Sequence, residues 1–254
     1  MSMPDSPNAE PYLLEAAREA VAGGADSLTL HLRADRRHIQ DEDIWIIRKE
    51  AGVPLNMEMG NTPEIVDIAC AVKPAFVCLV PENRQEVTTE GGLDAAGQKA
   101  SLAKTIKRLQ EIGIKVSLFL DPEPGQIHAA KELGAEMVEL HTGTFANHFG
   151  DARADEVKRL VAAAELGHGL GIQMNAGHGL TTRNLPDLFP VPHLVELNIG
   201  HHLVSRALII GLRQSVREMR EVMSKYEGGG HKEKTPHMSF DFKFSSTFGK
   251  PPKK

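Results

Sequence analysis

Histidine and glutamate side chains stand at or just after the ends of short apolar segments in this 254-residue chain. His31 lies near the end of segment 27–32, Glu58 near the end of 54–59, and Glu139 within 137–141. His178 follows segment 173–176. Imidazole and carboxylate groups are the side chains that most often move protons in catalysis. We therefore expect these four residues to carry out general acid–base chemistry.

A single histidine at a strand end is more often a structural residue than a catalytic one. His201 follows a fifth segment, 194–199, and convergence of three histidines and two glutamates from five segments on one rim favours catalysis instead. Histidine and glutamate also bind metals, but the spacing does not favour a metal site. There is no His-x-His pair, and no glutamate lies one helical turn from a histidine on a credible metal-binding helix. We expect no metal.

Two glycine-containing turns follow the last two apolar segments. Their sequences are NAGHGL at 175–180 and NIGHHL at 198–203. Backbone N–H groups at such strand-to-helix turns can point at an anion, which makes the turns with Gly177, Gly179 and Gly200 candidate phosphate-binding sites. The alternative is that the glycines only permit tight turns.

A third candidate anion site is the basic loop 33–38, in which guanidinium groups suit phosphate oxygens. The guanidinium groups belong to Arg33, Arg36 and Arg37. Salt bridges that cap a helix are the alternative, because Asp35 can neutralise one arginine. Thr88 lies in the polar loop TTEGG at 88–92, which either caps a helix or donates hydrogen bonds to phosphate.

Short apolar runs must position these residues, and they alternate with longer amphipathic segments. The expected strands span 27–32, 54–59, 76–81, 115–121, 137–141, 173–176 and 194–199. The expected helices span 11–22, 41–51, 63–72, 93–112, 123–133, 152–170 and 203–225. Nearly continuous apolar strands that alternate with helices indicate a parallel sheet, wound open or closed into a barrel. Polar groups at the strand ends then share one face.

The strands recur about every 28 residues, close to the spacing in an eight-stranded TIM barrel of about 250 residues. The sequence offers only seven strands before residue 226, however, and it opens with a helix. We therefore predict an α/β fold of the TIM (β/α) barrel type with seven recognisable strands and the first strand missing. The predicted divisions are an irregular lead at 1–9, the barrel at 10–226 and a flexible basic tail at 227–254.

Composition excludes several classes of protein. Hydrophobic residues make up 41% and charged residues 25%, as in a folded globular domain. A net charge of −5 gives no general positive field for nucleic acid. No apolar run is long enough to cross a membrane, and no signal-like segment opens the chain. Two cysteines, Cys70 and Cys78, are too few for a disulfide framework. We expect a cytoplasmic protein that does not bind membranes or nucleic acid.

The ordered motifs together resemble the pyridoxine 5′-phosphate synthase family (PdxJ). They are HLRADRRHI at 31–39, NMEM at 56–59, LVPE at 79–82, EVTTEGGLD at 86–94, VSLFLD at 116–121, ELHTG at 139–143, NAGHGL at 175–180 and ELNIGH at 196–201. The resemblance runs from about residue 10 to residue 223. It implies a TIM barrel, usually a homo-octamer, that needs no metal or organic cofactor.

The resemblance also implies a reaction between two small phosphorylated substrates. The family joins 3-amino-1-hydroxyacetone 1-phosphate to 1-deoxy-D-xylulose 5-phosphate and releases inorganic phosphate and water. By resemblance, His31 and Glu58 accept protons, His178 donates one, and Glu139 supports the transition state. The implied ligands of the deoxyxylulose phosphate are Arg33, His38 and Thr88. Those of the amino-ketone phosphate are Gly179, Gly200 and His201.

One departure from the family pattern concerns the front of the barrel. Relatives begin with a strand bearing an Asn-x-Asp-His run, but here Pro4 and Pro7 oppose a central strand. Three explanations are open: the true start lies upstream, the chain borrows a strand from a neighbour or from its own tail, or the protein is an inactive descendant. The tail segment 238–244 alternates apolar and polar residues like a strand. A parallel pairing of this segment would require a demanding reversal of the chain.

Three functional hypotheses follow from these observations. The first is the ring-forming synthase. The second is an inactive or truncated homologue that binds phosphate or serves in assembly, which the absent strand favours. The third is another phospho-sugar isomerase or aldolase on the same barrel. The third would ordinarily need a Schiff-base lysine or a metal, and no lysine ends a strand in the motifs above.

Overall fold

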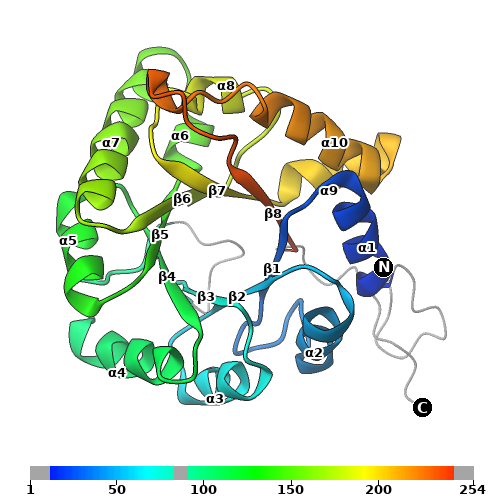
Figure 1. Ribbon diagram of the computed structural model, residues 1–254, viewed down its shortest axis with the longest axis vertical. Coiled ribbons are helices and arrows are strands. Elements are labelled where there is room, and N and C mark those ends of the chain that lie inside the picture. The colour runs from blue at the N-terminus through cyan, green and yellow to red at the C-terminus, as the bar shows by residue number, and fades with distance from the viewer. Residues whose placement is uncertain (1–11, 83–90, 243–254) are drawn as a thin grey trace.

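Eight parallel strands close into a barrel in the computed structural model, which describes residues 12–82 and 91–242. Figure 1 looks down the barrel, with the helices forming an outer ring. The strands are β1 (Ser27–His31), β2 (Leu55–Met59), β3 (Phe76–Leu79), β4 (Lys115–Leu120), β5 (Met137–His141), β6 (Gln173–Gly177), β7 (Leu194–Ile199) and β8 (His237–Asp241). The barrel architecture is the one that the strand–helix alternation predicts.

The helices that surround the strands follow the expected segments closely. They are α1 (Leu13–Gly23), α2 (Asp41–Glu50), α3 (Pro63–Val72), α4 (Lys99–Gln110), α5 (Pro124–Leu133), α6 (Gly143–Asn147), α7 (Gly150–Gly169), α8 (Leu185–Leu188), α9 (His201–Ile210) and α10 (Leu212–Met223), with the short 3-10 helix η1 (Gly228–Gly230). None of these helices is long and apolar enough to span a membrane.

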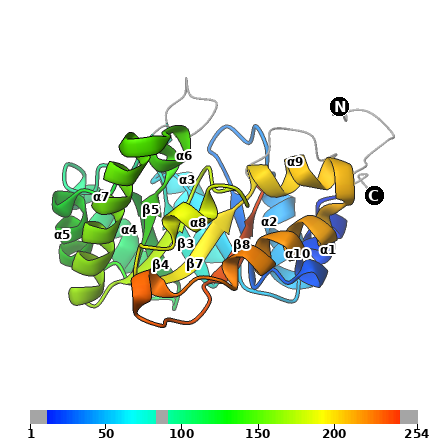
Figure 2. The same ribbon diagram turned by 90° about the horizontal axis from the view of Figure 1, so that it is seen from above.

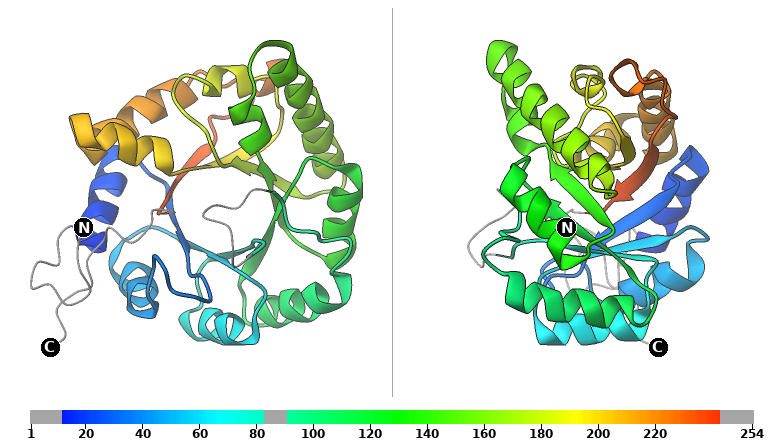
Figure 3. Two further views of the ribbon diagram at one scale, coloured as in Figure 1. Left: turned by 180° about the vertical axis from the view of Figure 1, so that it is seen from behind. Right: turned by 60° about the vertical axis from the view of Figure 1, so that its left-hand side comes forward.

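The prediction of seven strands is wrong, because β8 comes from the segment that was expected to be a flexible tail. It pairs in parallel with β7 on one side and with β1 on the other. Figure 3 shows β8, in red, beside the blue strand β1. Met238 and Phe240 point outward into the helix-covered core, and both are fully buried. This alternation of apolar and polar residues is the pattern that a strand with one apolar face requires.

The chain reversal that seemed to oppose this pairing is supplied by α10. A helix that follows a parallel strand returns the chain to the opposite end of the barrel, so the next strand starts in the parallel direction. The segment 224–236, which contains η1, then crosses to the start of β8. Residues 227–242 are therefore part of the barrel and extend it beyond the expected boundary at residue 226.

Helix α1 occupies the position in the outer ring next to α10, and α2 lies on its other side (Figure 1). Figure 2 shows α1 and α10 side by side. The two helices pack closely, since a Cβ on Gly23 would lie 2.6 Å from the Val216 Cβ. In the ring, α1 therefore follows β8, although it precedes every strand in the sequence.

The single helix expected over 203–225 is wrong, because Gly211 interrupts it. Gly211 has φ 80° and ψ 153°, a conformation that ends α9 and begins α10 at a new angle. Two other glycines in the left-handed region lie between a helix and a strand. Gly24 has φ 111° and Gly134 has φ 74°, and each ends its helix.

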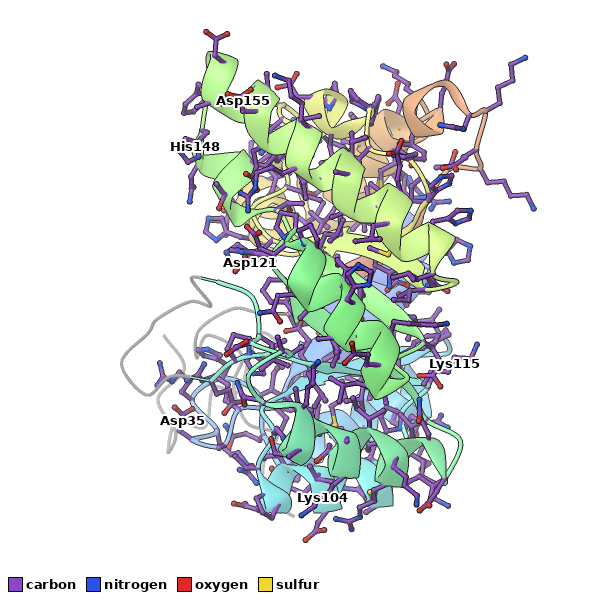
Figure 4. All side chains as sticks on the ribbon, turned by 90° about the vertical axis from the view of Figure 1, so that its left-hand side faces the viewer. Asp35, Lys104, Lys115, Asp121, His148 and Asp155 are labelled. Atoms are coloured by element: carbon purple, nitrogen blue, oxygen red, sulfur yellow. The ribbon has the colours of Figure 1, made fainter. Side chains whose placement is uncertain are left out.

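The carboxyl ends of the strands share one face of the barrel, which we call the mouth. In Figure 4, Asp121, which follows β4, lies at the mouth together with Asp35, whereas Lys115, which begins β4, lies at the opposite face. Beneath the mouth the barrel interior is unusually polar. Its buried polar side chains include Thr29, Asn56, Glu58, Ser117, Glu139, Asn175, Asn198 and Ser239. Such groups require hydrogen-bond partners inside the barrel.

Candidate functional site

His31 lies between two carboxylates at the mouth. It is the last residue of β1, next to Glu58 in the register of β1 and β2. The His31 Nδ1 is 3.9 Å from the Glu58 Oε2, and the His31 Nε2 is 3.0 Å from the Glu82 Oε1. All three side chains are largely buried, with relative exposures of 5% for His31, 0% for Glu58 and 11% for Glu82. The structure therefore brings together the two expected proton acceptors and adds a third ionisable group.

Glu82 is held in place by backbone groups as well as by His31. Its Oε1 accepts a hydrogen bond from the Gly60 N–H at 2.9 Å, and its Oε2 accepts one from the Ala34 N–H at 3.2 Å. Burial opposes ionisation of Glu82, but the hydrogen bonds from His31 and the two N–H groups outweigh it and lower the pKa below its ordinary value. An ionised Glu82 only accepts hydrogen bonds, so His31 donates from Nε2. Nδ1, which faces Glu58, is then the nitrogen that can take up a proton.

The basic loop 33–38 contains the salt bridges that were the alternative to phosphate binding. Asp35 accepts hydrogen bonds from both Arg33 and Arg37. The Arg37 hydrogen bond is the main reason that the pKa of Asp35 lies far below its ordinary value. Arg36 pairs with Asp41 at 2.8 Å, in the first turn of α2, and with Glu64 at 2.6 Å. The loop thus carries three arginines in a fixed arrangement beside His31.

His38 is half-buried at the end of this loop. Burial and the positive charges of His31, Arg33 and Arg37 lower its pKa. Among the residues that the structure describes, the His38 Nδ1 has no hydrogen-bond partner although it is buried. A neutral imidazole with an available ring nitrogen suits a hydrogen bond to a ligand.

Glu139 lies deeper, in the polar interior of the barrel, and is 1% exposed. The Asn198 Nδ2 donates a hydrogen bond to the Glu139 Oε2 at 2.5 Å, and the Cys78 thiol lies 3.8 Å from the same oxygen. The other side of Asn198 accepts a hydrogen bond from the Thr29 hydroxyl at 3.3 Å. Glu139, on β5, is therefore held by side chains from two other strands, β3 and β7, under the centre of the mouth.

His178 packs against a second histidine–carboxylate pair. The rings of His178 and His141 have centroids 5.2 Å apart, and Phe119 lies 5.0 Å from His141. The His141 Nδ1 is 2.9 Å from the Asp121 Oδ1. That hydrogen bond is the largest influence on Asp121 and lowers its pKa despite partial burial. Carboxylate and ring contacts thus restrict the orientation of both imidazoles.

The turn after β6 has a strained backbone, and hydrogen bonds from neighbouring side chains stabilise it. His178 and Gly179 have φ of 82° and 77°. Both values lie in the left-handed region, which residues other than glycine, such as His178, rarely adopt. The Thr142 hydroxyl lies 2.7 Å from the carbonyl oxygens of both Gly177 and His178, and the Asn184 amide donates to the Gly179 carbonyl at 3.0 Å. Strain of this kind is typical of functional sites.

The turn after β7 leads directly into α9. Gly200 precedes the first residue of that helix, His201, so the N–H groups of the first helical turn lie at the mouth. The next residue, His202, is 3.2 Å from the Thr182 hydroxyl, which joins this turn to the one after β6. Burial, followed by the charges of Arg206 and Arg183, lowers the pKa of His202. The two glycine turns therefore form one connected region.

The predicted residues fall into three neighbouring groups at the mouth. His31 and Glu58 lie with the basic loop, Glu139 lies under the centre, and His178 lies with the glycine turns. Thr88 falls outside the described residues. No residue group in 12–82 or 91–242 has three or more His, Cys, Asp or Glu side chains placed to hold a metal ion.

Glu82, Asp121 and His141 lie within the motifs LVPE, VSLFLD and ELHTG, but the sequence assigned these three residues no role. Glu82 pairs with His31, and Asp121 pairs with His141. The signal was present, since Glu82 lies just after β3 and Asp121 just after β4. What the sequence lacked was the side-chain geometry that joins them to particular imidazoles.

Comparison with known families gives a match over most of the chain. Residues 6–225 match the family described as "Pyridoxal phosphate biosynthesis protein PdxJ". The chain is 57% identical over 225 residues to a pyridoxine 5′-phosphate synthase of Akkermansia muciniphila, covering 88% of this chain and 92% of the relative. It is 48% identical over 215 residues to one of Coxiella burnetii, covering 84% and 90%.

Solved structures share the barrel at low sequence identity. A structure titled "Native KDPGal structure" has a TM-score of 0.58 and 15% identity, covering 86% of this chain and 90% of the other. The Amycolatopsis orientalis BexX/CysO complex contains a chain with a TM-score of 0.56 and 14% identity, covering 84% and 85%. These similarities show the fold alone.

Proposed function

This chain belongs to the PdxJ family of pyridoxal phosphate biosynthesis proteins and is an enzyme of vitamin B6 synthesis, and we propose that the residues at its mouth perform the pyridoxine 5′-phosphate synthase reaction in specific roles. The reaction condenses 3-amino-1-hydroxyacetone 1-phosphate with 1-deoxy-D-xylulose 5-phosphate. The observation that supports the proposal most strongly is His31 held between Glu58 and Glu82.

The chemistry demands repeated proton transfers between atoms that are held close together. An amine must add to a ketone with loss of water, phosphate must leave, and the ring must close and lose water again. In this proposal His31 accepts protons at Nδ1 and exchanges them with Glu58, which lies 3.9 Å away. Glu82 keeps the ring in the tautomer that leaves Nδ1 available.

His178 is the proposed proton donor on the other side of the mouth. Its ring lies against His141, which the Asp121 carboxylate orients. Glu139 supports the transition state from below, and the hydrogen bond from Asn198 fixes its carboxylate. A preorganised carboxylate stabilises positive charge that develops on a nitrogen during condensation.

Each of the two substrates carries one phosphate group, through which the protein can bind and position it. We assign the deoxyxylulose phosphate to the basic loop, with Arg33, His38 and Thr88 as ligands. The amino-ketone phosphate goes to the connected glycine turns, with Gly179, Gly200 and His201 as ligands. N–H groups at the start of α9 and the dipole of that helix favour an anion at this place.

The decisive experiment mixes the purified full chain with both substrates. We expect a pyridine absorbance and release of inorganic phosphate, each dependent on both substrates. A folded protein that binds the two phosphates and yields no product would favour the inactive, phosphate-binding homologue. That hypothesis rested on the absent first strand; β8 gives the barrel an eighth strand, but the sequence contains no Asn-x-Asp-His run.

The proposal also includes the oligomeric state of the protein and its location in the cell. We assign a homo-octamer to the protein in solution, which light scattering coupled to size exclusion tests directly. A cytoplasmic location is supported by the low cysteine content, since Cys70 and Cys78 are too few for the disulfide framework typical of exported proteins. Cell fractionation with an antibody to the chain tests that location.

A further inference from the structure

The last residue of β8 is an aspartate at the mouth, outside the segment that matches the family. Asp241 is paired with Thr29 of β1 in the barrel register and is 5% exposed. Ser239, two residues earlier, faces the interior, since its hydroxyl is 2.7 Å from that of Thr29. Side chains two apart on a strand share a face, so Asp241 also faces the interior, one layer nearer the mouth.

Asp241 adjoins the turn that begins α9. A Cβ on Gly200 would lie 3.2 Å from the Asp241 Cβ and 2.3 Å from the Asp241 carbonyl oxygen. On its other side, β1 carries His31 two residues beyond Thr29 and on the same face. The Asp241 carboxylate therefore lies between the proposed phosphate-binding turn and the proposed proton acceptor.

A carboxylate in this place selects among ligands by charge. It repels the oxygens of a phosphate, yet the adjoining N–H groups of α9 favour them. A ligand that carries a phosphate at one end and an ammonium group at the other satisfies both features. The amino-ketone phosphate is such a molecule, since its amine is largely protonated near neutral pH and only three carbons separate its two charged ends.

We propose that Asp241 is a substrate-binding residue that holds the amino group of 3-amino-1-hydroxyacetone 1-phosphate. This assignment rests on the proposed function, because it places the phosphate of the same substrate on the turn at Gly200. It also puts the amine on the side of the mouth where His31 can accept its proton before the amine attacks the ketone. Strand β8 then contributes to recognition as well as to closure of the barrel.

A binding experiment with two probes tests the proposal. Calorimetry compares the amino-ketone phosphate with hydroxyacetone phosphate, which lacks only the amine. We expect the wild-type chain to bind the amino-ketone phosphate about tenfold more tightly, the effect of one charge-assisted hydrogen bond. In Asp241→Asn this preference should fall below about twofold, while hydroxyacetone phosphate binds as well as before.

Two further variants separate charge from structure. Asp241→Glu keeps the charge and should retain part of the preference. Ser239→Ala removes the hydroxyl pair with Thr29 without changing the charge at the mouth, and should keep the full preference even if it lowers the melting temperature. An undiminished preference in Asp241→Asn would overturn the proposal, as would equal binding of both probes by the wild type.

The experiment also separates this proposal from the proposed function. Binding needs no turnover, so a chain that prefers the amino-ketone phosphate but forms no pyridine would keep the Asp241 assignment and lose the catalytic one. Product formation with an unchanged Michaelis constant for the amino-ketone phosphate in Asp241→Asn would do the reverse. Failure of both probes to bind would refute the phosphate site at Gly200 and the Asp241 assignment together.

Discussion

At the scale of single residues, the pairing of His31 with Glu82 decides which ring nitrogen can take part in proton transfer. The Glu82 carboxylate accepts a hydrogen bond from the His31 Nε2–H group, which leaves Nδ1 facing Glu58. A second imidazole, His141, is oriented by Asp121 in the same manner on the other side of the mouth. Each histidine–carboxylate pair joins side chains from different strands, which makes its geometry dependent on closure of the barrel.

The proposed acid and base residues predict large effects on turnover. We expect Glu58→Gln and His178→Asn each to lower kcat by about 100-fold or more, because each removes a group that exchanges protons with the substrate. Steady-state rates with both substrates measure this. Glu165→Gln, a surface change on α7, serves as the control and should leave the rate unchanged. Rates near wild type in both site variants would refute the assigned roles.

The ion pair of Glu82 predicts a pH-dependent stability. Its folded-state pKa lies below the ordinary value of 4.5, so it stabilises the fold above that pH and loses this contribution as the pH falls through the lower value. We expect Glu82→Gln to lower the melting temperature at pH 7, with the difference from wild type shrinking below pH 4.5. Melting curves at several pH values test this. A difference that stays constant down to pH 3 would contradict it.

The individual site residues were predictable to the extent that they end strands. His31 and Glu58 ended neighbouring strands in the sequence pattern, and parallel strands place such residues side by side. The partner of His31 was not predictable, because Glu82 reaches it from a loop whose path depends on hydrogen bonds to Gly60 and Ala34.

At the scale of elements, β8 contacts the turn at Gly200, so closure of the barrel places this strand against the proposed phosphate-binding region. The backbone of Asp241 lies where a side chain at position 200 would project. Only glycine permits this approach, so the packing of β8 requires glycine at this position whether or not the turn binds the proposed anion. The two explanations that the sequence left open for this glycine are therefore compatible.

We expect a larger side chain at this contact to lower the free energy of unfolding. In Gly200→Ala the new Cβ would lie 2.3 Å from the Asp241 carbonyl oxygen, so β8 or the start of α9 must shift. We expect a cost of about 1–3 kcal/mol, measured by urea denaturation. Gly125→Ala is the matched control, since its Cβ would meet nothing within 4 Å and it lies inside α5. Equal stability of the two variants would show that the contact tolerates a methyl group.

The strand and helix segments themselves were largely predictable, because each has a clear period of apolar residues. The break between α9 and α10 was not predictable, because the pattern of apolar residues continues through Gly211. Only the backbone conformation of Gly211 separates the two helices. The alternating apolar and polar residues of β8 are visible in the sequence, but the alternation alone did not predict that this strand joins the barrel. A short strand far from its partners in sequence gives no local sign of the sheet that it joins.

At the scale of the whole molecule, the barrel depends on a pairing between its first and last strands. The hydroxyls of Thr29 and Ser239, which join β1 to β8, belong to residues 210 positions apart. Ion pairs between Arg220 and Asp26 and between Arg213 and Glu19 tie α10 to α1 and the start of β1. The two ends of the described chain are thus part of one core.

The burial of β8 predicts its contribution to global stability. Phe240 is fully buried, so Phe240→Ala should lower the free energy of unfolding by about 3–5 kcal/mol. Phe149→Ala is the control, because Phe149 is 78% exposed, and it should cost about 1 kcal/mol or less. Chemical denaturation measures both. A small effect at Phe240 would mean that β8 is not part of the cooperative unit.

The pairing of β1 with β8 has a consequence for synthesis of the protein in the cell. The ribosome releases β1 early, whereas the segment that covers its open edge emerges some 210 residues later. Until then the nascent chain displays unpaired backbone on both β1 and β7, and such edges attract other chains. Folding of this barrel therefore finishes only after translation has passed β8, and chaperones that shield exposed strands should bind the chain during that interval.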